Sequence, residues 1–70
     1  MVSIGTRRLS GVISGLREAK GMSQRDLARK AGVTPGYIAQ LEMGLRKNPS
    51  LIVLQRLAKA LGVKVTELLR

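Results

Sequence analysis

The chain has 70 residues, thirteen of them Lys or Arg and four Asp or Glu, and its formal net charge is +9. It contains no Cys and no His, which leaves out disulfides, thiolate nucleophiles, the commonest general base and the commonest metal ligand. A chain of this length forms one small core without a deep substrate cavity. We therefore expect no enzyme, no cofactor, no metal and no small-molecule substrate, while the positive charge favours an anionic partner.

Apolar residues recur at three- and four-residue steps along the first part of the chain, which predicts two amphipathic helices. The first helix ends at Gly21. Its apolar face consists of Leu9, Val12, Ile13, Leu16 and the stem of Lys20. The second helix begins at Ser23, with Asp26 as its capping-box partner, and ends at Gly32.

Three more helices are predicted after Gly32. The third begins at Thr34-Pro35, where a capping hydroxyl precedes a proline in the first helical position, and it breaks near Gly44. Its apolar side consists of Ile38, Leu41 and Leu45. Asn48-Pro49-Ser50 forms a turn and a cap for the fourth helix, whose apolar stripe consists of Leu51, Leu54, Leu57, Ala58 and Leu61. A short, poorly capped helix over 65–69 follows.

Short helices with short connections and no alternating strand pattern predict an all-α fold. Residues 1–8 are predicted to form a flexible N-terminal arm, although Arg7 and Arg8 fit the start of the first helix equally well, and residues 9–70 a single domain.

The segment 24–41 has the spacing of two helices that cross steeply through a short turn. Such a crossing needs a small residue where the backbones approach, and Ala28 supplies it. The turn needs a residue that adopts the left-handed region without strain, which is the property of Gly32. Ile38 and Leu41 then face inward from the second of the two helices. This is the helix-turn-helix layout, in which that helix enters the DNA major groove.

The sequence resembles the lambda-repressor and Cro class of helix-turn-helix domains, also called the xenobiotic-response-element family. The resemblance covers residues 9–69. Its matching segments are Leu16-Arg17, Gly21-Met22-Ser23-Gln24, Leu27-Ala28, Ala31-Gly32-Val33-Thr34, Tyr37-Ile38, Gln40-Leu41-Glu42, Gly44, Asn48-Pro49-Ser50-Leu51 and Leu57-Ala58-Lys59-Ala60-Leu61-Gly62-Val63. The resemblance implies a compact five-helix domain, with the helix-turn-helix at helices two and three, that is usually a dimer on a two-fold operator and mostly a repressor.

The resemblance implies a recognition helix at about residues 34–43. The candidate base-contacting residues are Thr34, Gly36, Tyr37 and Gln40. Gln40 is predicted to hydrogen-bond a base edge, bidentate to adenine where geometry allows, or else to be a solvated surface residue. Tyr37 either contacts a phosphate or a thymine methyl, or is a half-buried core residue. The family often has polar side chains where Pro35 and Gly36 stand here, so we expect few direct base contacts and a share of shape readout.

Two further roles follow from the resemblance. Contacts to the DNA backbone are expected from Gln24, Arg46, Lys47 and Asn48, each of which is otherwise an ordinary surface residue. Arg17 and Glu42 are expected to form a partly buried, structural salt bridge between the first helix and the recognition helix.

Some apolar residues also lie outside the predicted core stripes. Ile52 and Val53 occupy positions where the family commonly has polar residues, and Ile52 points away from the core. Together with Leu45 they form a candidate dimer interface, because a two-fold interface uses the same surface on both partners.

These observations predict a sequence-specific regulator of transcription that binds double-stranded DNA, a homodimeric repressor with recognition helices about 34 Å apart. One alternative is a protein-interaction module, such as an antitoxin or a coactivator-type protein, with a protein partner. Another is a non-specific nucleic-acid binder driven by charge. The longest apolar run is Leu51-Ile52-Val53-Leu54, far short of the roughly 18 residues that cross a bilayer. We expect no membrane partner and a cytoplasmic, nucleoid-associated protein.

Overall fold

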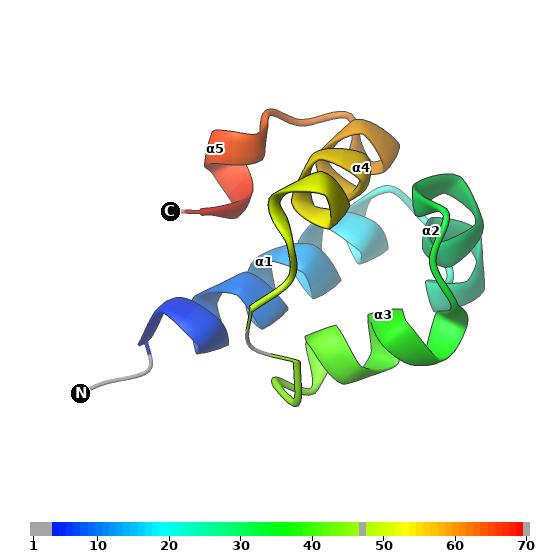
Figure 1. The fold of residues 1–70 in the computed structure, drawn as a ribbon. Helices are drawn as coiled ribbons and strands as arrows, with labels where there is room; N and C mark the ends of the chain where they lie inside the picture. Colours follow the sequence, from blue (N-terminus) through cyan, green and yellow to red (C-terminus); the bar gives the residue numbers. More distant parts are fainter. Residues whose placement is uncertain (1–3, 47, 70) are drawn as a thin grey trace.

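The structure is a computed structural model that describes residues 4–46 and 48–69, and the side chains from residue 9 onward. Its helices in chain order are α1 (Ile4–Ala19), α2 (Gln24–Ala31), α3 (Pro35–Glu42), α4 (Leu51–Leu61) and α5 (Val65–Leu68). These residues contain no strand, and the all-α, five-helix prediction is confirmed (Figure 1). No helix in these two ranges is long and apolar enough to cross a membrane.

The start of α2 forms the predicted capping box. The Ser23 hydroxyl accepts from the Asp26 backbone N–H at 2.9 Å, and the Asp26 carboxylate accepts from the Ser23 N–H at 3.1 Å. This exchange satisfies donors that would otherwise lack a partner at a helix N-terminus. The helix ends at Gly32 in the left-handed conformation, with φ 72°. Both boundaries of α2 are therefore local consequences of the sequence.

Hydroxyl caps also begin α3 and α4. The Thr34 hydroxyl accepts from the Tyr37 N–H at 3.0 Å, and the Ser50 hydroxyl accepts from the Val53 N–H at 3.2 Å. The start of α5 has no side-chain cap at Lys64, as predicted, although the Glu67 carboxylate accepts from the Lys64 N–H at 3.4 Å.

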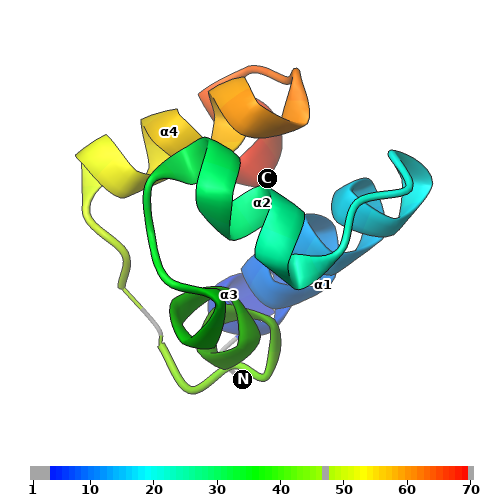
Figure 2. The ribbon, with the colours of Figure 1, turned by 90° about the vertical axis from the view of Figure 1, so that its right-hand side faces the viewer.

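One core joins all five helices. Its buried members are Leu9, Ile13, Leu27, Ala28, Ala31, Ile38, Leu41, Leu54, Leu57, Ala58, Leu61 and Leu68. The helix α2 packs against both α3 and α4, and α1 packs against α3. Figure 2 looks nearly along α3 and shows α2 crossing above it. The core therefore fixes how α3 is presented at one side of the molecule.

Two residues of the predicted apolar stripes lie outside this core. Leu51 is 61% exposed because it is the first residue of α4, and the helix meets the core only from Val53 onward. Leu45 is 65% exposed because α3 ends at Glu42. The chain then turns at Gly44, with φ 79°, so Leu45 does not continue the helical stripe.

Residues 4–8 lie in the first turns of α1, which agrees with the alternative that Arg7 and Arg8 begin the first helix. No proline interrupts this segment. Once a helix has formed, each further residue adds one backbone hydrogen bond and needs no new nucleation step. The helix α1 therefore extends readily towards its N-terminus. Residues 1–3 lie outside the described part of the chain.

Candidate nucleic-acid interface

The helix α3 has one buried and one open side. Ile38 and Leu41 are 0% and 1% exposed, so they hold the helix on the core. The predicted base-contacting residues Thr34, Gly36 and Gln40 are exposed. Tyr37 is half-buried and packs against the core, as the second of its two alternatives predicts, and its contact with DNA stays a prediction. The open side of α3 therefore carries the polar groups that the sequence predicted there.

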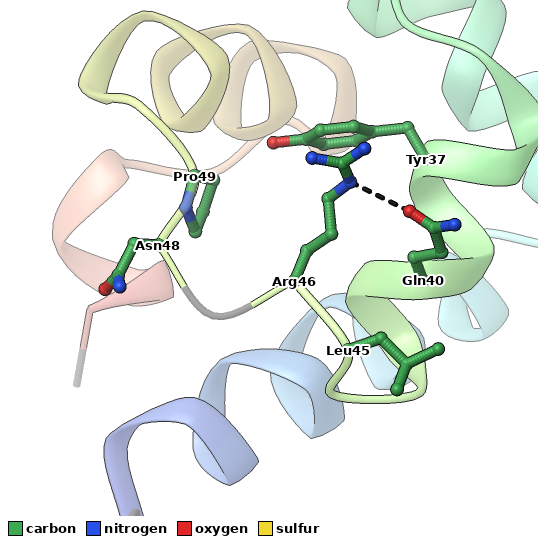
Figure 3. A pocket seen from close by; sticks show the side chains of 6 residues that line it. All are labelled: Tyr37, Gln40, Leu45, Arg46, Asn48 and Pro49. Carbon is green, nitrogen blue, oxygen red and sulfur yellow. Dashed lines mark hydrogen bonds between the residues drawn. The ribbon is translucent and has the colours of Figure 1, made fainter.

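Arg46 folds back over this open side. Its guanidinium carbon lies 4.8 Å from the centre of the Tyr37 ring, and its Nε donates to Gln40 Oε1 at 2.8 Å (Figure 3). The backbone supports the same arrangement, because the N–H groups of Leu45 and Arg46 both donate to the Gln40 carbonyl, at 2.9 and 3.3 Å. A shallow pocket is lined by Tyr37, Gln40, Leu45, Arg46, Asn48 and Pro49.

The sequence predicted Tyr37, Gln40 and Arg46 as three separate contacts and missed that they touch one another. The signal that could have found this is Gly44. A left-handed residue two positions after the end of α3 reverses the chain, and it brings a residue six positions after Gln40 back onto the helix. Asn48 is exposed beside this cluster, and Lys47 lies outside the described residues.

The predicted pair of Arg17 and Glu42 is present beneath the interface. Arg17 Nε donates to Glu42 Oε2 at 2.7 Å and Arg17 Nη2 to Glu42 Oε1 at 3.0 Å, a bidentate geometry. Arg17 Nη1 also donates to the Met22 carbonyl at 2.8 Å. The two side chains are 13% and 8% exposed. The hydrogen bond from Arg17 to Glu42 raises the pKa of Arg17 above its ordinary value.

Gln24 is the third member of this buried cluster. Its Nε2 donates to Glu42 Oε1 at 2.9 Å, and the side chain is half-buried. The carboxylate of Glu42 therefore receives hydrogen bonds from α1 and from α2. The sequence predicted a phosphate contact for Gln24 and missed this role, because no local pattern connects it to a residue eighteen positions away.

Large apolar side chains are exposed at several places among the described residues. They are Met43, Leu45, Leu51, Ile52 and Leu69. Of the predicted dimer residues, Leu45 and Ile52 belong to this set, whereas Val53 is half-buried against the core. Val53 is partly buried because it lies four positions before the buried Leu57, on the same face of α4.

The geometry defines a five-helix, helix-turn-helix domain, and the comparisons with known proteins agree. The Helix-turn-helix family profile matches residues 13–68. The chain belongs to this family, in its Cro and lambda-repressor type, which is a family of DNA-binding transcriptional regulators and not of enzymes.

The chain is similar to particular members of the family. It is 43% identical over 53 residues to y4dJ, an uncharacterized HTH-type transcriptional regulator of Sinorhizobium fredii, covering 76% of this chain and 68% of y4dJ. It is 40% identical over 57 residues to the HTH-type transcriptional regulator SinR of Bacillus subtilis, covering 81% of this chain. The match spans 51% of SinR, about half of its length.

Solved structures of similar proteins have the same fold as this chain. The restriction-modification controller protein C.AhdI from Aeromonas hydrophila superposes with a TM-score of 0.85 at 36% identity, covering 90% of this chain and 94% of C.AhdI. SinR in complex with DNA superposes with a TM-score of 0.85 at 37% identity, covering 89% of this chain and 98% of that structure.

Proposed function

We propose that this regulator is a sequence-specific repressor that binds a two-fold operator as a homodimer, with α3 in the major groove. One observation carries the proposal: α3 is fixed to the core by Ile38 and Leu41 while Thr34, Gly36 and Gln40 stay exposed on its other side. A helix fits the major groove, where each base pair presents a distinct pattern of donors and acceptors. The DNA complex of the similar protein SinR supports this use of the fold.

In this proposal the exposed groups divide into two kinds. Gln40 contacts a base edge, with Thr34, Gly36 and Tyr37 beside it. Contacts to the DNA backbone come from Gln24, Arg46, Lys47 and Asn48. Backbone contacts set the register and carry no sequence information, whereas base contacts specify the site. The net charge of +9 supplies a general attraction for the phosphates.

The dimer is proposed to form through the exposed apolar residues near the start of α4. Leu45 and Ile52 are 65% and 59% exposed, and Leu51 between them in the chain is 61% exposed. A second copy would cover them, and its recognition helix would then reach the next major groove about 34 Å away. Occupation of promoter DNA by such a dimer blocks transcription sterically. Its place of action would be the nucleoid, in the cytoplasm.

Selection of binding sites from a random duplex library at about 150 mM salt tests the proposal, because charge-driven binding is already weak there. Enrichment of an inverted repeat with half-sites about one helical turn apart is the expected result. If binding persists at low salt and no motif is enriched, the chain is a charge-driven binder and the repressor proposal fails.

The dimer has its own test. Ile52→Lys should shift the protein towards monomer in sedimentation equilibrium, and it should lower affinity for the full inverted repeat more than for a half-site. Thr66→Lys is the matched control, because it adds the same charge at an exposed position of a different helix, α5. An unchanged monomer–dimer equilibrium for Ile52→Lys would place the interface elsewhere.

A further inference from the structure

The contact between Arg46 and Gln40 determines which way the Gln40 amide points. A guanidinium carries only donors, whereas a glutamine amide carries one acceptor oxygen and one donor nitrogen. Because Arg46 Nε lies 2.8 Å from the amide, the oxygen must face Arg46. The NH₂ group therefore faces away from Arg46, as Figure 3 shows. An unrestrained glutamine on a helix surface would be free to turn either end outward.

Other contacts hold Arg46 in place for this role. The guanidinium lies over the half-buried Tyr37 ring, 4.8 Å from its centre, and a planar cation on an aromatic face is a favourable pairing. The N–H groups of Leu45 and Arg46 bind the Gln40 carbonyl, so the loop is attached to the residue that it orients. The amide is thus preorganised before any partner arrives.

The orientation of the amide has a consequence for base recognition. Adenine presents an acceptor and a donor in the major groove, so a bidentate glutamine needs both ends of its amide. Guanine presents two acceptors, N7 and O6, which suit an outward NH₂ group. We propose, on the basis of the proposed function, that Arg46 is a positioning residue that makes Gln40 select guanine over adenine. This differs from the adenine contact that the sequence alone predicts for Gln40.

Site selection with variants tests the inference through base identity, which a merely structural role for Arg46 would not change. The wild type should enrich guanine over adenine at one position of each half-site, by about 5- to 150-fold, the range of a good specific base contact. Arg46→Met removes every donor but keeps a long side chain. It should release the amide and move the preference at that position from guanine to adenine.

Two further variants make the assignment specific. Gln40→Ala should abolish the preference at that position, and Arg46→Met in the Gln40→Ala background should not restore any. Arg56→Met is the matched control, since it removes the same charge from an exposed position on α4 outside the pocket, and it should leave the guanine preference unchanged.

Each other result overturns the inference in an identifiable way. Enrichment of adenine by the wild type shows that the amide is not held as proposed, while the proposed function stands. Loss of guanine in Arg46→Met without a gain of adenine makes Arg46 the direct reader. An equal weakening of all sequences leaves Arg46 only the phosphate contact of the proposed function, without a positioning role. No enriched motif for the wild type removes both this inference and the proposed function.

Discussion

Two arginine-centred clusters are attached to α3, and they differ in exposure and in the group that accepts from the arginine, which is a carboxylate in one and a neutral amide in the other. In one, Arg17 donates to Glu42, and both side chains are largely buried. In the other, Arg46 donates to Gln40, and both residues are exposed. Glu42 and Gln40 are two positions apart, which is about 200° around a helix, so they face opposite directions.

The difference shows how one short helix can serve both stability and recognition. The buried cluster joins α1, α2 and α3 through three donors on the Glu42 carboxylate. Removing one partner there leaves a desolvated charge. The exposed cluster holds no desolvated charge, and its groups remain accessible to a partner. We therefore expect the first cluster to control folding and the second to control binding.

The largest expected effect comes from Glu42→Ala. It leaves the Arg17 charge without its carboxylate, and breaking such a pair costs about 3–5 kcal/mol. For a domain of this size we expect the melting temperature to fall by at least about 10 °C. Thermal unfolding followed by circular dichroism measures it. Arg56→Met, at an exposed position, is the control and should change stability by about 0.5 kcal/mol or less. Equal melting temperatures for the two variants would contradict the division between the clusters.

Gln40→Ala should affect binding and leave the fold intact. The lost base contact should lower discrimination at one operator position by about 1–3 kcal/mol, while the melting temperature stays within about 2 °C of the wild type, since surface substitutions rarely matter for stability. Competition binding against single-base variants of the selected site measures the first quantity. A substantial loss of stability with unchanged discrimination would reverse the roles assigned to the clusters.

Gln24→Ala should have an intermediate effect that belongs to the buried cluster. It removes one of three hydrogen bonds to the Glu42 carboxylate and leaves the ion pair intact. We expect a loss of about 1 kcal/mol in the free energy of unfolding, the usual contribution of one such bond. Urea unfolding measures it, with Gln55→Ala at an exposed position as the control. Were the two variants equally stable, Gln24 would have no structural role.

The smallest effect concerns pH and the capping box of α2. The pKa of Asp26 is lowered, first because its carboxylate accepts from the Ser23 backbone N–H, and also because of its contacts with the Ser23 side chain and with Arg29. A pKa that is lower in the folded state means that the stabilisation is present above about pH 4 and is lost as the pH falls through the folded value. Urea midpoints of the wild type and Asp26→Asn should therefore differ more at pH 6 than at pH 3. A difference that is constant with pH would exclude the carboxylate as its source.

Local chemistry explains what could be predicted of the fold. The capping box of Ser23 and Asp26, the hydroxyl caps of Thr34 and Ser50, and the left-handed Gly32 involve residues a few positions apart. Such patterns act through neighbouring backbone groups, so they appear in the sequence itself. The contacts of individual side chains with DNA stay predictions, because only the arrangement of α3 on the core has been established.

The sequence by itself determined the helices, most of their ends and most of the core, because helix periodicity and capping are short-range. It also indicated the Arg17–Glu42 pair, through the resemblance to a known family. Only the tertiary structure decided that Leu45 and Leu51 are exposed, that Gln24 binds Glu42 and that Arg46 donates to the amide oxygen of Gln40. These features depend on where a chain reversal or a helix crossing brings distant residues together, and hydrophobic spacing carries no information about that.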